Sequence, residues 1–216
     1  RDCLLSRGLG DVYKRQSYAR GLVDRGVRVI DLSADFRLNC PDVYEEYYGN
    51  AHPDTALMKE AVYGLPEWRA AEIARARIVA SPGCYPTSIL LPLIPLFKAG
   101  ILEPEDVVVC SGSGVSGAGR KASIPLLFCE CNESFHAYGV PKHRHLSEIE
   151  QELSWAAGET VVMSFTPHLI PVNTGICSTI TARVKEGADP DSVGRLLEEA
   201  YAGAPFVRLL GRNQPA

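Results

Sequence analysis

One cysteine lies where a run typical of a buried strand gives way to a sequence typical of a helix. Cys84 follows residues 74–80 and the turn Ser81-Pro82-Gly83, and Pro86 favours the first turn of a helix. The sulfur would then lie near the free N–H groups of the helix N-terminus, where thiolate is favoured over thiol. Cys84 is therefore a candidate nucleophile, and the alternative is a small buried residue in a tight turn.

A nucleophilic thiol needs a proton partner, and three of the five histidines fall within ten residues, at His136, His143 and His145. An imidazole that titrates near neutrality can take a proton from a thiol and return one to an oxyanion. The spacing alone does not choose among the three. The alternative for each is a surface histidine or a hydrogen-bonded core histidine.

A zinc site is a competing hypothesis, since thiolate and imidazole are preferred zinc ligands. Its candidate ligands are Cys129, Cys131, His136, His143 and His145. Structural zinc sites usually place paired cysteines about two to four residues apart. Cys129 and Cys131 have one residue between them, and on a strand they would point to opposite faces. We therefore expect no metal, with a zinc-binding module as the alternative.

A glycine-rich segment, residues 112–121, combines backbone freedom with hydroxyls and two cations. This composition suits close approach by a phosphate or a carboxylate. The segment matches neither the P-loop nor the dinucleotide-binding fingerprint in order. A flexible solvent-exposed loop is the alternative.

The elements that must position these residues fall into two parts. Residues 27–32 and 74–80 predict buried parallel strands, after a helix that ends near Gly26 and with the polar, tyrosine-rich connection 35–68 between them. This is the rhythm of an open α/β sheet, so we expect residues 17–83 to form part of a nucleotide-binding domain. Residues 1–16 show neither helical nor strand periodicity and are interpreted as a non-native leader.

Residues 84–216 predict a second domain of α+β type with a mixed or antiparallel sheet. Ser147 is the expected N-cap of one of its helices. The expected helices span residues 86–97, 147–155 and 191–202, and the expected strands span 107–110, 160–165 and 176–184.

Composition excludes several classes of function. The chain has 216 residues, a formal net charge of −4 and a pI near 5.8, so it lacks the basic field of a nucleic-acid binder. The longest apolar run, 88–97, contains two prolines and is shorter than the roughly 20 residues that cross a bilayer. Seven cysteines without a dense disulfide pattern indicate a reducing, cytoplasmic setting.

Five motifs together resemble the N-acetyl-gamma-glutamyl-phosphate reductases, members of the semialdehyde dehydrogenase family. They are Asp31-Leu32-Ser33-Ala34-Asp35-Phe36-Arg37, Val62-Tyr63-Gly64-Leu65-Pro66-Glu67, Ser81-Pro82-Gly83-Cys84-Tyr85-Pro86-Thr87, the segment 113–120 and the segment 143–149. The resemblance covers residues 21–216 and implies a remnant of a Rossmann-type nucleotide-binding domain joined to a catalytic and dimerisation domain. Aspartate-semialdehyde and glyceraldehyde-3-phosphate dehydrogenases share this plan.

The resemblance implies an activity in arginine biosynthesis. The family reduces N-acetyl-gamma-glutamyl phosphate to N-acetylglutamate 5-semialdehyde with NADPH and releases phosphate through a cysteine thioester. A homo-oligomer and a small-molecule substrate are expected, with no nucleic acid or membrane partner. The alternatives are a thiol acyl-transferase or hydrolase that uses Cys84 and His145 without hydride transfer, and the zinc-binding module.

The resemblance also implies roles for single residues. Cys84 is the expected nucleophile and His145 the general acid/base, with His143 as the second candidate. Arg120, Arg144, His143 and Arg37 are expected to bind the anionic groups of the substrate. NADP is expected to contact Ser113, Gly114, Ser116, Gly117 and Gly119.

The sequence departs from the family pattern at two places. Ser81 replaces the usual Asn before Pro-Gly-Cys, and Asn173-Thr174-Gly175 stands where a basic residue is common, which puts one anion contact in doubt. A G-x-G-x-x-G fingerprint opening a strand and helix is not found upstream, and the family's last helix would lie after Ala216. We therefore expect these 216 residues alone to bind NADPH poorly and to be inactive.

Overall fold

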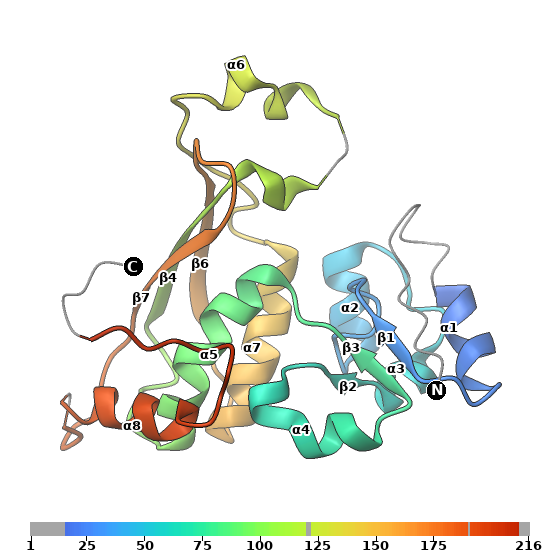
Figure 1. Ribbon diagram of the computed structural model, residues 1–216, viewed down its shortest axis with the longest axis horizontal. Helices are drawn as coiled ribbons and strands as arrows, with labels where there is room; N and C mark the ends of the chain where they lie inside the picture. Colours follow the sequence, from blue (N-terminus) through green and yellow to red (C-terminus); the bar gives the residue numbers. More distant parts are fainter. Residues whose placement is uncertain (1–15, 120–121, 190, 212–216) are drawn as a thin grey trace. The chain divides into compact units, whose positions relative to one another are not determined.

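The computed structural model describes residues 16–119, 122–189 and 191–211 (Figure 1). The chain divides into two compact units, Arg1–Thr87 and Ser88–Ala216. Each unit is described by itself below. The predicted leader, apart from Gln16, lies outside the described residues.

The first unit contains a three-stranded parallel sheet in the order β1-β3-β2. Its strands are β1 (Val29–Asp31), β2 (Val62–Tyr63) and β3 (Ile78–Ala80). Its helices are α1 (Gln16–Val23), α2 (Pro41–Tyr48), α3 (Thr55–Glu60) and α4 (Pro66–Arg75). The strands expected at 27–32 and 74–80 are confirmed with shorter bounds, because Ala74 and Arg75 belong to α4.

The core of this unit is made where α1, α2 and α3 meet β3. Its buried side chains are Ala19, Val23, Phe36, Leu38, Tyr44, Leu57, Met58, Ile78 and Ala80. The residues 35–68, expected to be a connection, contribute the helices α2 and α3, the strand β2 and the first residues of α4. The local signals for these helices were present: Pro41 begins α2, Gly49 ends it with φ of 80°, and the Asp54 side chain caps α3.

The second unit contains a four-stranded mixed sheet in the order β5-β6-β4-β7. Its strands are β4 (Val107–Ser113), β5 (His136–Ala137), β6 (Met163–Leu169) and β7 (Ile176–Thr181). β4 is parallel to β6 and antiparallel to β7, and β5 is antiparallel to β6. The predicted mixed sheet is therefore confirmed.

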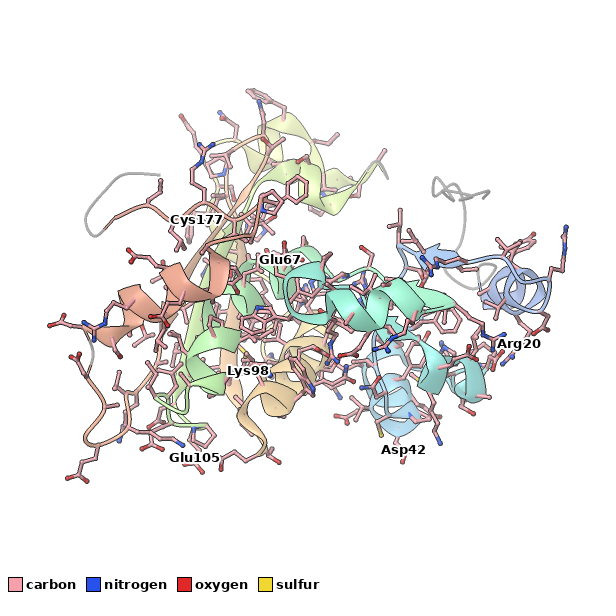
Figure 2. All side chains as sticks on the ribbon, turned by 60° about the horizontal axis from the view of Figure 1, so that its bottom comes forward. Arg20, Asp42, Glu67, Lys98, Glu105 and Cys177 are labelled. Carbon is pink, nitrogen blue, oxygen red and sulfur yellow. The ribbon has the colours of Figure 1, made fainter. Side chains whose placement is uncertain are left out.

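The helices of the second unit follow most of the predicted ranges. They are α5 (Cys84–Lys98), which begins in the first unit, η2 (Val115–Ala118), η3 (Ile124–Leu126), α6 (Phe128–Cys131), α7 (Arg144–Ala157) and α8 (Ser192–Tyr201). α5 and α7 lie along the sheet, whereas the segment that carries α6 projects beyond it (Figure 1). Lys98 at the end of α5 lies 4.2 Å from the ring centroid of Trp155 on α7 (Figure 2).

The helix α5 continues through two prolines and uses one of the gaps they create. Pro95 has no N–H, so the carbonyl of Leu91 has no partner from the helix ladder. The hydroxyl of Tyr201 on α8 donates to that carbonyl. Because Pro95 cannot donate to the Leu91 carbonyl, this carbonyl accepts a hydrogen bond from α8 instead, and the bond joins α8 to α5.

Two local predictions were wrong, at Ser147 and at residues 111–113. Ser147 is not an N-cap: α7 begins earlier, the His143 side chain caps it, and the Ser147 hydroxyl donates to the carbonyl of Arg144 at 2.9 Å. Cys129 and Cys131, for which a strand was considered in weighing the zinc hypothesis, lie on the short helix α6, where the N–H of Cys131 donates to the carbonyl of Leu127. Residues 111–113 belong to β4 rather than to a loop, because they pair with both β6 and β7.

Among the residues that the structure describes, no helix is both long enough and apolar enough to span a membrane.

A testable consequence concerns Asp54, whose carboxylate accepts the N–H of Leu57 and pairs with both Nε and Nη2 of Arg20 at 2.7 and 2.6 Å. Arg20 is labelled in Figure 2. We expect Asp54→Ala to lower the free energy of unfolding by about 1–2 kcal/mol, because a cap is lost with the ion pair. Asp54→Asn keeps a capping oxygen and should lose less. Equal losses in urea denaturation would contradict the capping role.

Candidate active site

The thiol of Cys84 is exposed at the first residue of α5. The helix begins two residues before the predicted start at Pro86, so the cysteine belongs to the first turn itself. The carbonyl of Gly83 accepts both the N–H and the hydroxyl of Thr87, at 3.0 and 2.9 Å. Gly83 and Tyr85 on either side of the cysteine are buried. The chain around Cys84 is therefore fixed while the sulfur is open to a reagent.

The strand end that leads to Cys84 is anchored from both neighbouring strands. The carbonyl of Ala80 accepts the N–H of Gly64 at 2.8 Å, and the N–H of Ser81 donates to Asp31 at 2.8 Å. A Cβ on Gly64 would lie 2.9 Å from the Ala80 oxygen, so only glycine permits this approach. The bonds of Ser81 use backbone atoms and do not depend on its side chain, which is where the sequence departs from the family.

Arg37 lies beside this strand end and is buried, with 8% of its surface exposed. Its Nε donates to the carbonyl of Ser81 at 2.7 Å and its Nη2 donates to the carbonyl of Leu32 at 3.3 Å. The structure therefore places the Arg37 guanidinium against backbone carbonyls of the first unit, and its expected contact with the substrate stays a prediction.

The two histidines at the start of α7 have different environments. Nδ1 of His143 accepts the N–H of His145 at 3.1 Å, so this nitrogen carries no hydrogen and the neutral ring carries it on Nε2. The ring packs against Tyr138, Phe165 and His145, with centroids 5.7, 5.6 and 5.0 Å away. Burial, helped by the charge of Arg144, lowers the pKa of His143 from 6.5 to about 4.

These environments favour His145 over His143 as a proton donor and acceptor. A ring whose pKa is about 4 is uncharged near neutral pH, and its Nδ1 is already engaged by the helix. His145 is half-buried in the first turn of α7, and Arg144 next to it is exposed. The helix start thus brings His143, Arg144 and His145 together.

The glycine-rich segment is held against the loop that follows β6. The N–H groups of Gly114, Val115 and Ser116 donate to Gly175, Val172 and Asn173 at 2.9 to 3.0 Å. The N–H groups of Gly117 and Gly119 donate back to Gly114 and Ser116. These five amides are therefore already bonded within the protein, and the anion-binding use of the segment stays a prediction.

The side chains of the segment divide between inside and outside. Ser113 is buried and its hydroxyl donates to the carbonyl of Gly114 at 3.1 Å, whereas Ser116, Gly117 and Gly119 are exposed. Arg120, a predicted anion-binding residue, lies outside the described residues together with Lys121.

A chain of three serines, which the sequence analysis missed, ties α5 to the sheet. The hydroxyl of Ser178 on β7 lies 2.7 Å from that of Ser111 on β4 and 2.9 Å from that of Ser88 on α5. Ser111 and Ser178 face each other in the strand register. Ser88 lies one turn after Cys84, which was the available signal, but its partners follow from a register that the sequence does not reveal.

The described residues contain no group of three or more His, Cys, Asp or Glu side chains arranged to hold a metal ion. The thiol of Cys131 donates to the carbonyl of Pro125 at 3.0 Å.

Comparison with known families assigns both parts of the chain. The sequence model described as semialdehyde dehydrogenase, dimerisation domain, matches residues 84–216, and the one described as semialdehyde dehydrogenase, NAD binding domain, matches residues 11–76. The chain belongs to the semialdehyde dehydrogenase family. The predicted family and fold class are confirmed.

Two curated relatives of the chain carry the same name. The chain is 93% identical over 200 residues to the N-acetyl-gamma-glutamyl-phosphate reductase of Akkermansia muciniphila, covering 93% of this chain and 58% of that protein. It is 54% identical over 184 residues to the reductase of Rhodospirillum rubrum, covering 85% of this chain and 52% of that protein. The chain therefore spans a little more than half the length of these semialdehyde dehydrogenase family members.

Solved structures of the semialdehyde dehydrogenase family have the same fold. Aspartate semialdehyde dehydrogenase II of Vibrio cholerae, in complex with ASA, superposes with a TM-score of 0.61 at 17% identity, over 92% of this chain and 60% of that chain. The enzyme of Candida albicans with NADP gives 0.55 at 14% identity, over 89% and 54%.

The His143 cap predicts a pH dependence of stability in this semialdehyde dehydrogenase chain. Between pH 6.5 and about 4 the unfolded chain binds a proton that the folded protein excludes, so stability is lost as the pH falls through this window. Asn at this position would keep the cap without titrating.

We expect urea denaturation to show a steeper loss for the parent than for His143→Asn between pH 7 and pH 5. Burial also lowers the pKa of His52. Both proteins contain His52, so its contribution cancels when the two pH profiles are subtracted. Parallel pH profiles would contradict the prediction.

Proposed function

We propose that the chain is part of a reductase that converts N-acetyl-gamma-glutamyl phosphate to N-acetylglutamate 5-semialdehyde and phosphate, with NADPH, in arginine biosynthesis. The observation that carries this proposal is the exposed thiol of Cys84 on a turn whose backbone is hydrogen-bonded before and after it, in a chain 93% identical to a curated reductase of that name. Residues 17–83 are the proposed partial nucleotide-binding domain and residues 84–216 the proposed catalytic and dimerisation domain.

The proposed chemistry begins with the Cys84 sulfur. The thiolate attacks the acyl carbon, a carbon–sulfur bond forms, and the carbon–oxygen bond to phosphate breaks with release of inorganic phosphate. This leaves a thioester on Cys84. NADPH, when bound, supplies the hydride that takes the thioester to the aldehyde level. Collapse of the resulting thiohemiacetal releases the semialdehyde and regenerates the thiolate.

His145 is the proposed proton carrier. Its imidazole donates a proton to the oxyanion of the reduced adduct and recovers it when the adduct collapses. Cys84 lies in the first unit and His145 in the second, so their pairing is part of the proposal. The exposed Arg144 is the proposed contact for a carboxylate or phosphate of the substrate, with Arg120 as a second cation. His143 acts through the backbone of His145 and not as the general acid.

The glycine-rich segment fits the uncharged part of the cofactor better than its phosphates. Ser116 presents an exposed hydroxyl, and Gly117 and Gly119 present backbone without side chains. A Cβ on Gly117 would lie 2.8 Å from the Ser113 side-chain oxygen, so a larger residue at position 117 would crowd that hydroxyl. The exposed residues Ser116, Gly117 and Gly119 would therefore contact the cofactor directly. Ser113 and Gly114 are buried, and their role would be to hold the segment in place.

A substitution at the nucleophile tests the activity. In the complete protein, Cys84→Ser should lower the phosphate-dependent oxidation of the semialdehyde by at least about a thousandfold, since the nucleophile acts at the reacting carbon. Cys40→Ser, an exposed cysteine of the same unit, is the matched control and should retain activity. Near-normal activity of Cys84→Ser would overturn the assignment. Turnover of acyl phosphate that does not depend on NADPH would favour the thiol acyl-transfer alternative.

We also propose that the complete protein is a homo-oligomer that uses the open face of the second sheet. On β4 and β7 the exposed residues alternate with covered ones, which places Val108, Cys110, Cys177, Thr179 and Thr181 on one face. The serine chain and α5 lie on the other face. Figure 2 labels Cys177. The family model that covers this sheet is described as a dimerisation domain.

A charge on this face tests the oligomer. Thr179→Arg should shift the complete protein to a smaller species in sedimentation velocity, since an unpaired buried charge opposes association. Glu198→Arg, on α8, is the matched control and should not change the sedimentation coefficient. An unchanged coefficient for Thr179→Arg would contradict the assignment of this face.

A further inference from the structure

The helix that carries Cys84 lacks two of its internal hydrogen bonds. Helix α5 contains Pro92 and Pro95, and a proline has no N–H to donate to the carbonyl four residues before it. The helix therefore lacks its ladder bonds to the carbonyls of Ser88 and Leu91. Prolines are common sites of helix bending, so the direction of the first turn of α5 depends on what holds the helix at these two residues.

Ser88 is held by the sheet of the second unit. Its hydroxyl lies 2.9 Å from that of Ser178 on β7, which in turn lies 2.7 Å from that of Ser111 on β4. Ser111 is buried, and it pairs with Ser178 in the strand register. A hydroxyl can donate one hydrogen bond and accept others, so Ser178 can bond to both neighbours at once. Ser178 thus links the helix to two strands.

Leu91 is held by α8. The hydroxyl of Tyr201 donates to the Leu91 carbonyl, and only 5% of the Tyr201 surface is exposed. Ser88 and Leu91 are three residues apart, so they are neighbours on the helix surface. Side-chain hydroxyls from two other elements of the second unit therefore hold α5 at both residues where the prolines remove ladder bonds.

We infer that Ser178 and Tyr201 are positioning residues that set the place of the Cys84 thiol through α5. Cys84 lies four residues before Ser88 on the same face of the helix, so a change of helix direction at Ser88 moves the sulfur. The bonds of Thr87 to the Gly83 carbonyl hold the first turn together, so it moves as one piece. The inference rests on Cys84 being the nucleophile of the proposed function.

Acylation of Cys84 by acetyl phosphate in the complete protein tests the placement of the sulfur. The thiolate forms a bond to the acetyl carbon, the carbon–oxygen bond to phosphate breaks, and inorganic phosphate leaves. The acetyl thioester of Cys84 is detected by mass spectrometry. For Ser178→Ala and for Tyr201→Phe we expect the maximal acylation rate to fall about fivefold or more, with the half-saturating concentration within about twofold of the parent.

A second serine variant tests whether Ser178 acts through the helix. Ser88→Ala breaks the same contact from the other side, so it should slow acylation to a similar extent. The double variant Ser88→Ala/Ser178→Ala should then be no slower than the slower single variant, because both changes remove one interaction. A double variant slowed by the product of the two single effects would contradict transmission through Ser88.

The matched control is Ser154→Ala. The Ser154 hydroxyl accepts the N–H of Val161 at 2.9 Å, so this variant loses a hydrogen bond of the second unit that does not involve α5. It should keep the parent rate whatever its melting temperature. Circular dichroism and thermal melting identify any variant that has not folded. Tyr201→Phe, which removes only an oxygen atom, then carries the comparison.

Each hydroxyl is judged by its own variant. An unchanged maximal rate in a folded Ser178→Ala or Tyr201→Phe protein overturns the role of that residue. A half-saturating concentration raised by about tenfold with an unchanged maximal rate also overturns it, because that result indicates lost substrate binding.

A parent that is not acylated at all would instead count against the proposed function. Placement is then judged by iodoacetamide, with the exposed Cys40 as internal reference. A change of at least about threefold in the Cys84 to Cys40 alkylation ratio supports the positioning role of the substituted residue, and an unchanged ratio overturns it.

Discussion

The satisfaction of backbone polar groups at the end of β3 is the constraint on which the candidate site depends. A chain that leaves a parallel sheet and enters a helix within four residues must find partners for each N–H and C=O on the way. Here Gly64, Asp31 and Arg37 provide them before the turn, and Thr87 provides them after it. The exposed sulfur therefore belongs to a stretch of backbone that is hydrogen-bonded on both sides of the turn.

The start of α7 shows the same principle with a different donor and acceptor. A helix leaves its first N–H groups without partners, and here an imidazole nitrogen accepts one of them. That use fixes the tautomer of His143 and is compatible only with the neutral ring. Two histidines two residues apart thus have different environments, because Nδ1 of His143 accepts a helix N–H whereas His145 is the one that the proposed reaction uses.

Much of the fold could be predicted from the sequence where the signal is local. The β-branched run at β1, the apolar run of α5 and the helix after Pro190 have strong periodicity and clear breaks. The helices α2 and α3 were missed although Pro41 and Asp54 mark their starts, because tyrosines and acidic residues obscure the apolar pattern. The short helix α6 has no local signature that separates it from a strand.

The candidate site was predictable as a set of residues and less so as a set of contacts. Cys84 and His145 stand out by motif, but the serine chain depends on the register between β4 and β7. Burial of Arg37 also depends on the fold, since an arginine in a motif looks the same whether it faces a ligand or a carbonyl. Sequence identifies which side chains have the chemistry, and the strand pairing decides which of them are already engaged.

The glycine-rich segment after β4 has a consequence of its own. Because its amides are bonded either to the neighbouring loop or within the segment, Gly114, Gly117 and Gly119 have given up much of their conformational freedom as part of folding. For the proposed cofactor contact, this means that the conformational entropy lost when a flexible glycine loop is ordered on binding would be smaller.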